Sequence, residues 1–195
     1  MKNRLLLGSG NLGKLKEIQF YLNHFSIYLG YEVITTKDLN NLIEPVEDAL
    51  TFQENAKIKS QHYFNLTGLT TISDDSGFII DGLDNYPGVK TARVAKDLGS
   101  EQDVINFIFS KFENMKQLSA TFYCALSLIT KDKQYNCLGK IKGKMIPEKK
   151  GTNGFGYDAF FIPNQSENTF AEMSDDKKLI ASHRFQAFKL LSSQI

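Results

Sequence analysis

The chain has 195 residues, 42% of them hydrophobic, and its 23 basic residues nearly balance 22 acidic ones. That length suits one sizeable core, so we expect a single domain over residues 1–195. The near-neutral charge argues against nucleic acid or an anionic membrane surface as a partner. Apolar runs are too short for a signal peptide or a membrane span, and Cys124 and Cys137 are expected to be buried thiols. We therefore expect a cytoplasmic protein.

The first third alternates strands and helices. A buried strand is expected at 4–7, a helix at 14–25, and a second strand at 31–36. A polar connection over 39–49 leads to a helix at 51–66, which Thr51 and Glu54 open as a capping box. Gly68 is placed to end that helix.

The remaining chain is richer in strands. "LTTIS" is expected to be a strand that delivers the carboxylates of "DDSG" to a loop, followed by a short extended piece and the turn-rich "GLDNYPGVKTAR". A helix at 100–115, an antiparallel pair at 120–130 and 135–146, a strand at 159–163 and a helix from about Ser174 complete the chain. Helices between the early strands and direct pairing of the later ones predict an α/β fold with a mixed sheet.

The stretch "GSGNLGK" fits two phosphate-binding patterns. Read as G-x-G-x-x-G, it needs an acidic residue at the end of the second strand, but Glu32 begins that strand. Read as a P-loop, it needs a hydroxyl after Lys14, and Leu15 has none. A ligand-free turn is the alternative to a phosphate loop. A lysine at the start of a helix opposes the helix dipole unless an anion lies beside it. Lys14 therefore favours the interpretation of this stretch as a phosphate loop.

Carboxylates for a metal ion are expected from "ISDDSG" and "EPVED". In extended backbone Asp74 and Asp75 point to opposite faces, and we favour Asp75 as the ligand. The alternative is that both cap a turn. In "EPVED", Glu44, Glu47 and Asp48 are candidate partners, or the loop is a solvated acidic segment.

Three further groups have both a structural and a functional interpretation. Lys59 lies on the inward face of its helix, where a lysine has an anionic partner or lays its stem along apolar surface. "GTNGFGYD" offers an aromatic platform with a carboxylate for a base, or a turn with core aromatics. His183 and Arg184 within the last helix could donate to a base edge, or lie on the surface.

Five segments together resemble the inosine triphosphate pyrophosphatase family, the non-canonical purine nucleoside triphosphate pyrophosphatases. In family order they are "GSGNLGKLKE", "EDALTFQENAKIKS", "SDDSGFIIDGLDNYPGVKTAR", "GTNGFGYDAFF" and "AEMSDDKKLIASHR". They extend over nearly the whole chain. The resemblance implies a long, mixed, twisted sheet flanked by helices in two lobes, a central substrate cleft, and a homodimer.

The resemblance also implies the chemistry. The implied reaction is Mg²⁺-dependent hydrolysis of ITP, dITP and XTP to the monophosphate and pyrophosphate, which cleanses the nucleotide pool. Glu47 and Asp75 would hold the metal ion, and Asp75 and Lys59 would be catalytic. The implied substrate-binding residues are Ser9, Gly10, Asn11, Leu12, Gly13, Lys14, Ser76, Phe155, Gly156, Tyr157, Asp158, Lys178, His183 and Arg184.

Two other classes of protein stay open on the sequence alone. A nicotinamide-dependent oxidoreductase would use the G-x-G-x-x-G pattern and bind NAD without magnesium. A non-catalytic nucleotide-binding module would bind triphosphates without turnover. The acidic pair beside the phosphate loop argues against both.

Overall fold

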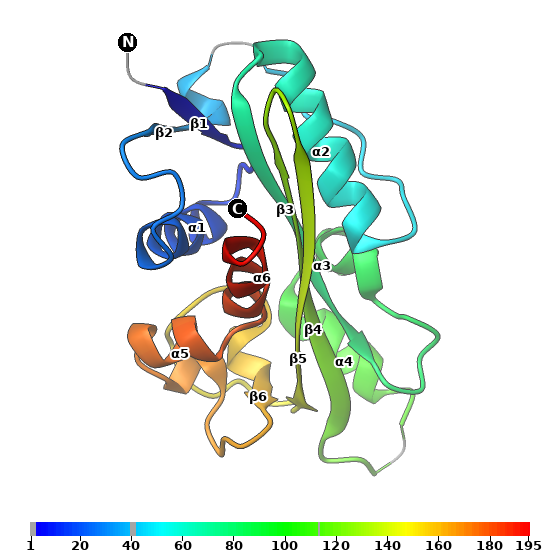
Figure 1. Cartoon of the computed structure of the whole chain (residues 1–195). Coiled ribbons are helices and arrows are strands. Elements are labelled where there is room, and N and C mark those ends of the chain that lie inside the picture. Colours follow the sequence, from blue (N-terminus) through cyan, green and yellow to red (C-terminus); the bar gives the residue numbers. More distant parts are fainter. Residues whose placement is uncertain (1–2, 40–41, 113) are drawn as a thin grey trace. The chain divides into compact units, whose positions relative to one another are not determined.

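The computed structural model describes residues 3–39, 42–112 and 114–195 (Figure 1). In this part of the chain the fold is a mixed α/β arrangement, with a six-stranded sheet in the order β2-β1-β3-β4-β5-β6. The strands are β1 (Arg4–Leu7), β2 (Glu32–Thr35), β3 (Thr70–Ile80), β4 (Leu118–Ile129), β5 (Gln134–Met145) and β6 (Phe161–Pro163). β1 pairs in parallel with β2 and β3, whereas β5 and β6 pair antiparallel. The predicted mixed sheet is confirmed.

The chain divides into two compact units. Unit 1 comprises residues 1–76, 124–139 and 184–195, and unit 2 comprises residues 77–123 and 140–183. The long strands β3, β4 and β5 contribute residues to both units. Each unit is described by itself below.

Unit 1 is built around β1. Its three leucines, Leu5 to Leu7, are buried, as is typical of a parallel strand covered on both faces. Helix α1 (Leu12–His24) packs on α6 (His183–Ser192) through Tyr21 and Phe188, whose ring centroids are 5.2 Å apart. Helix α2 (Phe52–Thr67) begins at the predicted cap Thr51 and ends at Gly68 in the left-handed conformation. A short 3₁₀ turn, η1 (Thr36–Asp38), follows β2.

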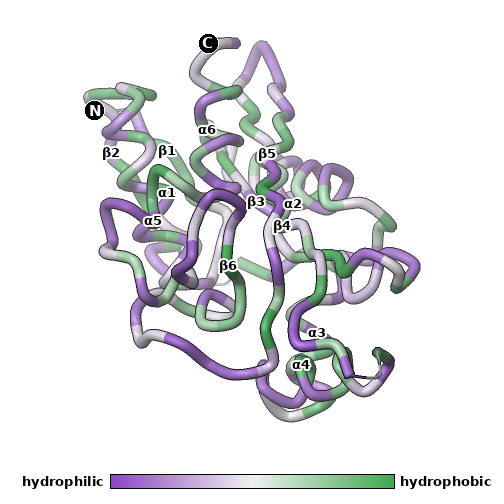
Figure 2. The backbone as a smooth tube through the Cα atoms, turned by 90° about the horizontal axis from the view of Figure 1, so that it is seen from below, coloured by the Kyte–Doolittle hydropathy of each residue, from purple (hydrophilic) through white to green (hydrophobic). Residues whose placement is uncertain are grey.

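Unit 2 has an aromatic core. Phe122 and Phe161 stack with centroids 4.0 Å apart, and Phe78 and Phe170 belong to the same buried cluster. Around it lie helices α3 (Thr91–Leu98), α4 (Glu101–Phe109) and α5 (Asp175–Ala181), and the 3₁₀ turns η2 (Gly88–Lys90), η3 (Gly156–Phe160) and η4 (Phe170–Glu172). Figure 2 shows hydrophilic and hydrophobic residues mixed along α4 and α6. No helix in the described part of the chain could cross a membrane.

Three sequence-based boundaries were wrong in ways that matter for the site. The "DDSG" stretch is not a loop, because β3 continues through it between β1 and β4, and sheet pairing outweighs the local turn preference. The first helix starts at Leu12, so Leu12 and Gly13 are helical. The C-terminal helix is broken at Ser182, whose extended backbone separates α5 from α6.

Two other differences lie in unit 2. Helix α3 was expected to be turn-rich coil, and it was missed because its first residue follows Lys90, which provides no side-chain cap. The helix predicted over 100–115 ends at Phe109. Residue 113 of that prediction, and residues 40–41 of the predicted polar connection, fall outside the described residues. Cys124 and Cys137 are buried thiols, as predicted.

Candidate functional site: two clusters of polar side chains

The glycine loop between β1 and α1 is shaped by close packing. A Cβ added at Gly8 would overlap the Ser73 hydroxyl and lie 2.8 Å from the Tyr63 ring, so only glycine fits there. Asn11 caps α1 by accepting from the Lys14 N–H at 3.1 Å. The N–H groups of Leu12 and Gly13, in the first turn, have no acceptor inside the helix. A helix end of this kind is suited to an anion, and phosphate binding there stays a prediction.

Asp74 lies at the centre of the charged groups in unit 1. Its carboxylate is fully buried, 3.0 Å from Lys14 Nζ and 3.3 Å from Arg184 Nη2, and it accepts from Ser76 Oγ at 2.7 Å. Burial alone would raise the pKa of Asp74, but the charges of Lys14, Arg184 and Lys59 outweigh it and hold that pKa well below its usual range. The anion that the helix dipole argument required beside Lys14 is therefore present in the chain itself.

Glu17 is a functional candidate that the sequence analysis missed. It lies on α1, one turn after Lys14, and forms a buried ion pair with Arg184. The signal was the spacing of three between Lys14 and Glu17, which places both on one helix face. Arg184 is 2% exposed, so the surface interpretation of this residue is wrong, and its described partners are Glu17, Asp74 and Ser76. Its role toward a base stays a prediction.

Asp75 has a different hydrogen-bond partner from Asp74, in line with the alternation along a strand, although Lys14 and Lys59 act on both carboxylates. Asn55 Nδ2 donates to Asp75 Oδ2 at 3.1 Å. Burial raises the pKa of Asp75 to about 6, although the charges of Lys14 and Lys59 oppose that increase. Asp75 is thus a carboxylate at neutral pH that protonates readily in mild acid.

Lys59 has the anionic partner expected of an inward-facing lysine. Its ammonium lies 2.8 Å from Glu47 and donates to the backbone carbonyl of Asp74 at 3.0 Å. It therefore connects the loop that carries Glu47 to the strand that carries Asp75. Glu44 lies at another point of the glycine loop, with Oε1 3.2 Å from where a Cβ of Gly10 would be.

The donor set of unit 1 fits a hard cation that retains water. Among the described residues no three His, Cys, Asp or Glu side chains gather as a ready-made metal site. Mg²⁺ is held in nucleotide enzymes by one or two carboxylates together with substrate phosphates, so a complete protein cage is not required. Glu47 and Asp75 match that donor set, and Lys59 pairs with Glu47 while donating to the backbone carbonyl of Asp74, the residue before Asp75.

The second cluster lies in unit 2. Asp158 is 5% exposed, accepts from the Phe155 N–H at 2.7 Å and pairs with Lys178 at 2.7 Å. The Lys178 ammonium is 4.6 Å from the centroid of the Phe155 ring, within cation–π range. Phe155, Asp158 and Lys178 thus form one group, in which Lys178 joins the Phe155–Asp158 turn from a separate segment of the sequence. Gly156 follows with a φ of 59°, which glycine adopts without strain.

Tyr157 and His183 belong more to the core of unit 2. The Tyr157 ring packs 4.6 Å from that of Phe78, and burial raises the pKa of its hydroxyl above the usual range. His183 meets Phe122 edge-on at 5.3 Å. The contacts of Tyr157 are therefore those of an aromatic residue in the core, which was the structural interpretation of this turn.

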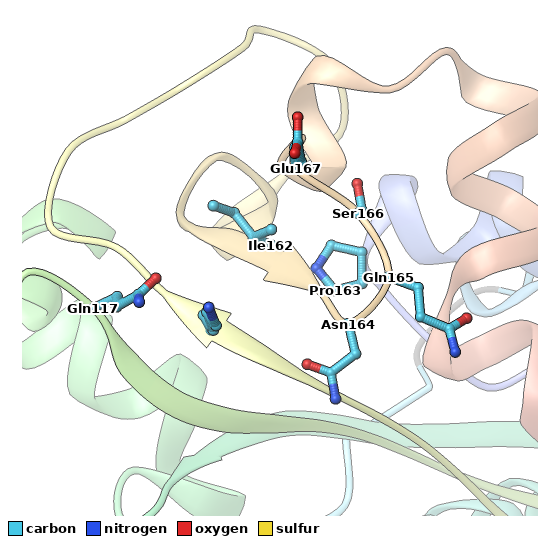
Figure 3. Close-up of a pocket in the computed structure, with 8 residues that line it drawn as sticks. Gln117, Ile162, Pro163, Asn164, Gln165, Ser166 and Glu167 are labelled. Carbon is cyan, nitrogen blue, oxygen red and sulfur yellow. The ribbon is translucent and has the colours of Figure 1, made fainter.

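A separate hollow of about 430 Å³ in unit 2 contains none of the predicted site residues. It is lined by Gln117 directly before β4, by Lys144 on β5, and by residues 162–167 of β6 and the turn after it (Figure 3). In Figure 3 the amide side chains of Gln117 and Asn164 lie on different segments of its rim. The candidate site is therefore defined by the two polar clusters and not by this hollow.

The fold and the unit 1 cluster define an α/β protein in which a glycine loop, two lysines and two adjacent strand carboxylates are assembled together. The chain belongs to the Ham1 family, whose model matches residues 5–194. This confirms the family resemblance drawn from the five sequence segments.

Curated relatives match almost the whole chain. It is 34% identical to the dITP/XTP pyrophosphatase of Vibrio parahaemolyticus serotype O3:K6, over 98% of this chain and 96% of the relative. It is 36% identical to the dITP/XTP pyrophosphatase of Zymomonas mobilis, over 96% of this chain and 90% of the relative. Among solved structures, a Staphylococcus aureus Ham1 protein matches with a TM-score of 0.84 and 30% identity, covering 98% and 97% of the two chains. A HAM1 protein from Coxiella burnetii matches with a TM-score of 0.83 and 33% identity, covering 98% of each.

Proposed function

We propose that this chain is a nucleoside triphosphate pyrophosphatase that hydrolyses ITP, dITP and XTP to the monophosphate and pyrophosphate. The observation that carries the proposal is the assembly of Lys14, Lys59 and the Asp74–Asp75 pair beside the glycine loop. The names of the curated relatives support it, because they match over nearly their full length. The consequence in a cell would be removal of non-canonical purines from the nucleotide pool.

The unit 1 cluster supplies the groups that phosphoanhydride hydrolysis needs. The loop from Ser9 to Lys14 would bind phosphate oxygens through its N–H groups and the lysine, and Lys59 would add a second cation. Glu47 and Asp75 would hold Mg²⁺, which when bound supplies charge neutralisation at the phosphates. Asp75 would also accept the proton of the attacking water.

The unit 2 cluster would recognise the purine. Phe155 offers a ring face, and Asp158, Lys178 and His183 offer polar groups, with Gly156 and Tyr157 shaping the turn. We propose that a donor from His183 meets the 6-keto oxygen of hypoxanthine or xanthine, with Arg184 as the alternative donor. Adenine has an amino group there and would leave buried donors unpaired, at a cost of about 1–3 kcal/mol each.

A matched assay tests this function. ITP, XTP, GTP and ATP are incubated with Mg²⁺ in H₂¹⁸O, and pyrophosphate, orthophosphate and the labelled product are quantified. We expect pyrophosphate and ¹⁸O-labelled IMP from ITP, with ATP nearly untouched, and no turnover after chelation. Orthophosphate as the product, or label in pyrophosphate, would show that another bond or another phosphorus atom is attacked.

The other finer proposals are checked separately. We propose that the protein is a homodimer. We also propose that it is located in the cytoplasm, because both cysteines are buried thiols in the structure. Light scattering of the purified chain should give twice its 22.0 kDa mass. NAD binding without magnesium would favour the oxidoreductase alternative, and tight triphosphate binding without turnover would favour a binding module.

A further inference from the structure

Helix α2 holds the preceding loop in place through three side chains on one face. We call residues 43–49 the acidic loop, because they include Glu44, Glu47 and Asp48. Asn55 Oδ1 accepts from the Ala49 N–H at 3.0 Å, Lys59 pairs with Glu47 at 2.8 Å, and His62 Nε2 lies 2.8 Å from the Ile43 carbonyl. Helix spacings of four and three put these three side chains on neighbouring turns of one face. The acidic loop therefore runs antiparallel to α2.

Among the described residues, the large apolar side chains of this segment contribute little packing. Ile43 and Val46 in the acidic loop, and Leu50 directly after it, are 76%, 75% and 89% exposed. A segment with few buried apolar contacts depends on its hydrogen bonds and ion pairs for order. Lys59 on α2 thus takes part in setting the position of Glu47.

Asn55 also hydrogen-bonds the Asp75 carboxylate itself, whereas Lys59 reaches β3 at the backbone carbonyl of Asp74. The Asn55 side chain is fully buried, and its Nδ2 donates to Asp75 Oδ2 at 3.1 Å as well as to the Ala49 carbonyl at 3.4 Å. An ionised carboxylate only accepts and a backbone N–H only donates, so only one orientation of this carboxamide satisfies both contacts. Asn55 therefore joins the backbone of the acidic loop directly to the Asp75 carboxylate.

We infer that Asn55 is a positioning residue that sets Glu47 and Asp75 in the arrangement required to bind a divalent cation. The inference rests on the proposed function for the role of these two carboxylates. Asn55 itself would not touch the cation, because its Nδ2 is a donor and its Oδ1 is engaged by Ala49. Asn55 would thus orient the metal ligands without binding the metal ion. Removing a group of this kind lowers metal affinity or activity by about 10- to 100-fold.

The test compares Asn55→Ala with Ser60→Ala. Ser60 is a matched control because it is on the same helix, is fully buried, and hydrogen-bonds Ser127 Oγ at 2.8 Å rather than the acidic loop. Mn²⁺ binding is titrated directly by electron paramagnetic resonance, with and without a non-hydrolysable nucleotide. We expect Asn55→Ala to weaken Mn²⁺ binding at least 10-fold and Ser60→Ala to change it less than 3-fold. Equal Mn²⁺ affinity in both variants would overturn the inference.

Amide hydrogen exchange gives a second readout that a general loss of stability would not reproduce. The Ala49 amide should exchange faster in Asn55→Ala than in Ser60→Ala, relative to the amides of β1 in each variant. If Asn55→Ala does not fold, the wild type decides: its Ala49 amide must exchange more slowly than that of Val46, and Mn²⁺ must slow it further. Exchange of Ala49 at the rate of Val46, or unaffected by Mn²⁺, would contradict the inference.

The two proposals can fail independently. Mn²⁺ titration and amide exchange do not require turnover, so they test Asn55 even if the wild type hydrolyses none of the triphosphates. With an active wild type, Asn55→Ala should raise the Mg²⁺ concentration for half-maximal rate at least 10-fold. The KM for ITP at saturating Mg²⁺ should change less than 3-fold, and the reverse pattern would place Asn55 in nucleotide binding instead.

Discussion

Replacing Asp74 by Asn removes the charge on which Lys14 and Arg184 converge in unit 1. Breaking a buried ion pair by removing one partner costs about 3–5 kcal/mol, because a buried charge is left without compensation. Arg184 retains Glu17, and Lys14, with 17% of its side chain exposed, can reach water. We therefore expect a loss near the lower limit, about 3 kcal/mol of unfolding free energy at pH 7.

The pH dependence of this loss has a definite sign. The pKa of Asp74 is lowered in the folded state, whereas an unfolded Asp titrates near about 3.9. Its ionised form therefore stabilises the fold fully above the unfolded pKa, and this contribution disappears as the pH falls below about 4 toward the folded pKa. The difference between wild type and Asp74→Asn should be constant from about pH 5 to 8 and shrink in stronger acid.

Urea unfolding followed by circular dichroism measures this difference. Asp132→Asn, at the exposed turn between β4 and β5, serves as the control and should stay within about 0.5 kcal/mol of wild type. A loss below about 1 kcal/mol for Asp74→Asn at pH 7, or a loss that grows in acid, would refute the reasoning about this buried carboxylate.

Three further predictions concern the chemistry, the base and the loop. Asp75→Asn should abolish turnover while the nucleotide affinity changes less than about 10-fold. The Mn²⁺ affinity of the wild type should fall below about pH 6, and this fall should be absent in Asp75→Asn. Calorimetry measures both affinities, and retained turnover in Asp75→Asn would remove Asp75 from the mechanism. Lys178→Met should change the ratio of kcat/KM for ITP to kcat/KM for ATP more than it changes kcat for ITP, because it removes the ion-pair partner of Asp158. An unchanged ratio would contradict a role of Lys178 in recognising the purine base. Gly8→Ala should lower the free energy of unfolding, measured with urea, by about 1–3 kcal/mol. Adding Ser73→Ala to this variant should recover part of that loss, because the added methyl group meets the Ser73 hydroxyl first. Full stability of Gly8→Ala would show that the loop can shift.

Local patterns were sufficient for several elements. The leucine run of β1, the Thr51 cap and Gly68 of α2, and the β4–β5 hairpin all follow from residues close together in sequence. Helix α3 was not predictable in this way, because neither a side-chain cap nor a buried apolar stripe marks it.

The site shows the same division. Alternation along a strand was enough to separate the environments of Asp74 and Asp75, and helix periodicity was enough to place Lys59 inward. The partner of Arg184, however, is Glu17, 167 residues earlier in the chain, and no local pattern pairs them. The break at Ser182 that buries Arg184 also depends on packing and not on a strong helix-stop signal.

By itself, the sequence determined the membership of this chain in its family, the alternation of strands and helices, and the types of charged group available for phosphate chemistry. Only the tertiary structure decided which charges meet. Burial raises the pKa of Asp75 to about 6, whereas nearby cations outweigh burial at the adjacent Asp74 and lower its pKa. These opposite shifts arise because burial and charge depend on groups brought together in space from distant parts of the chain, at distances that sequence spacing does not specify.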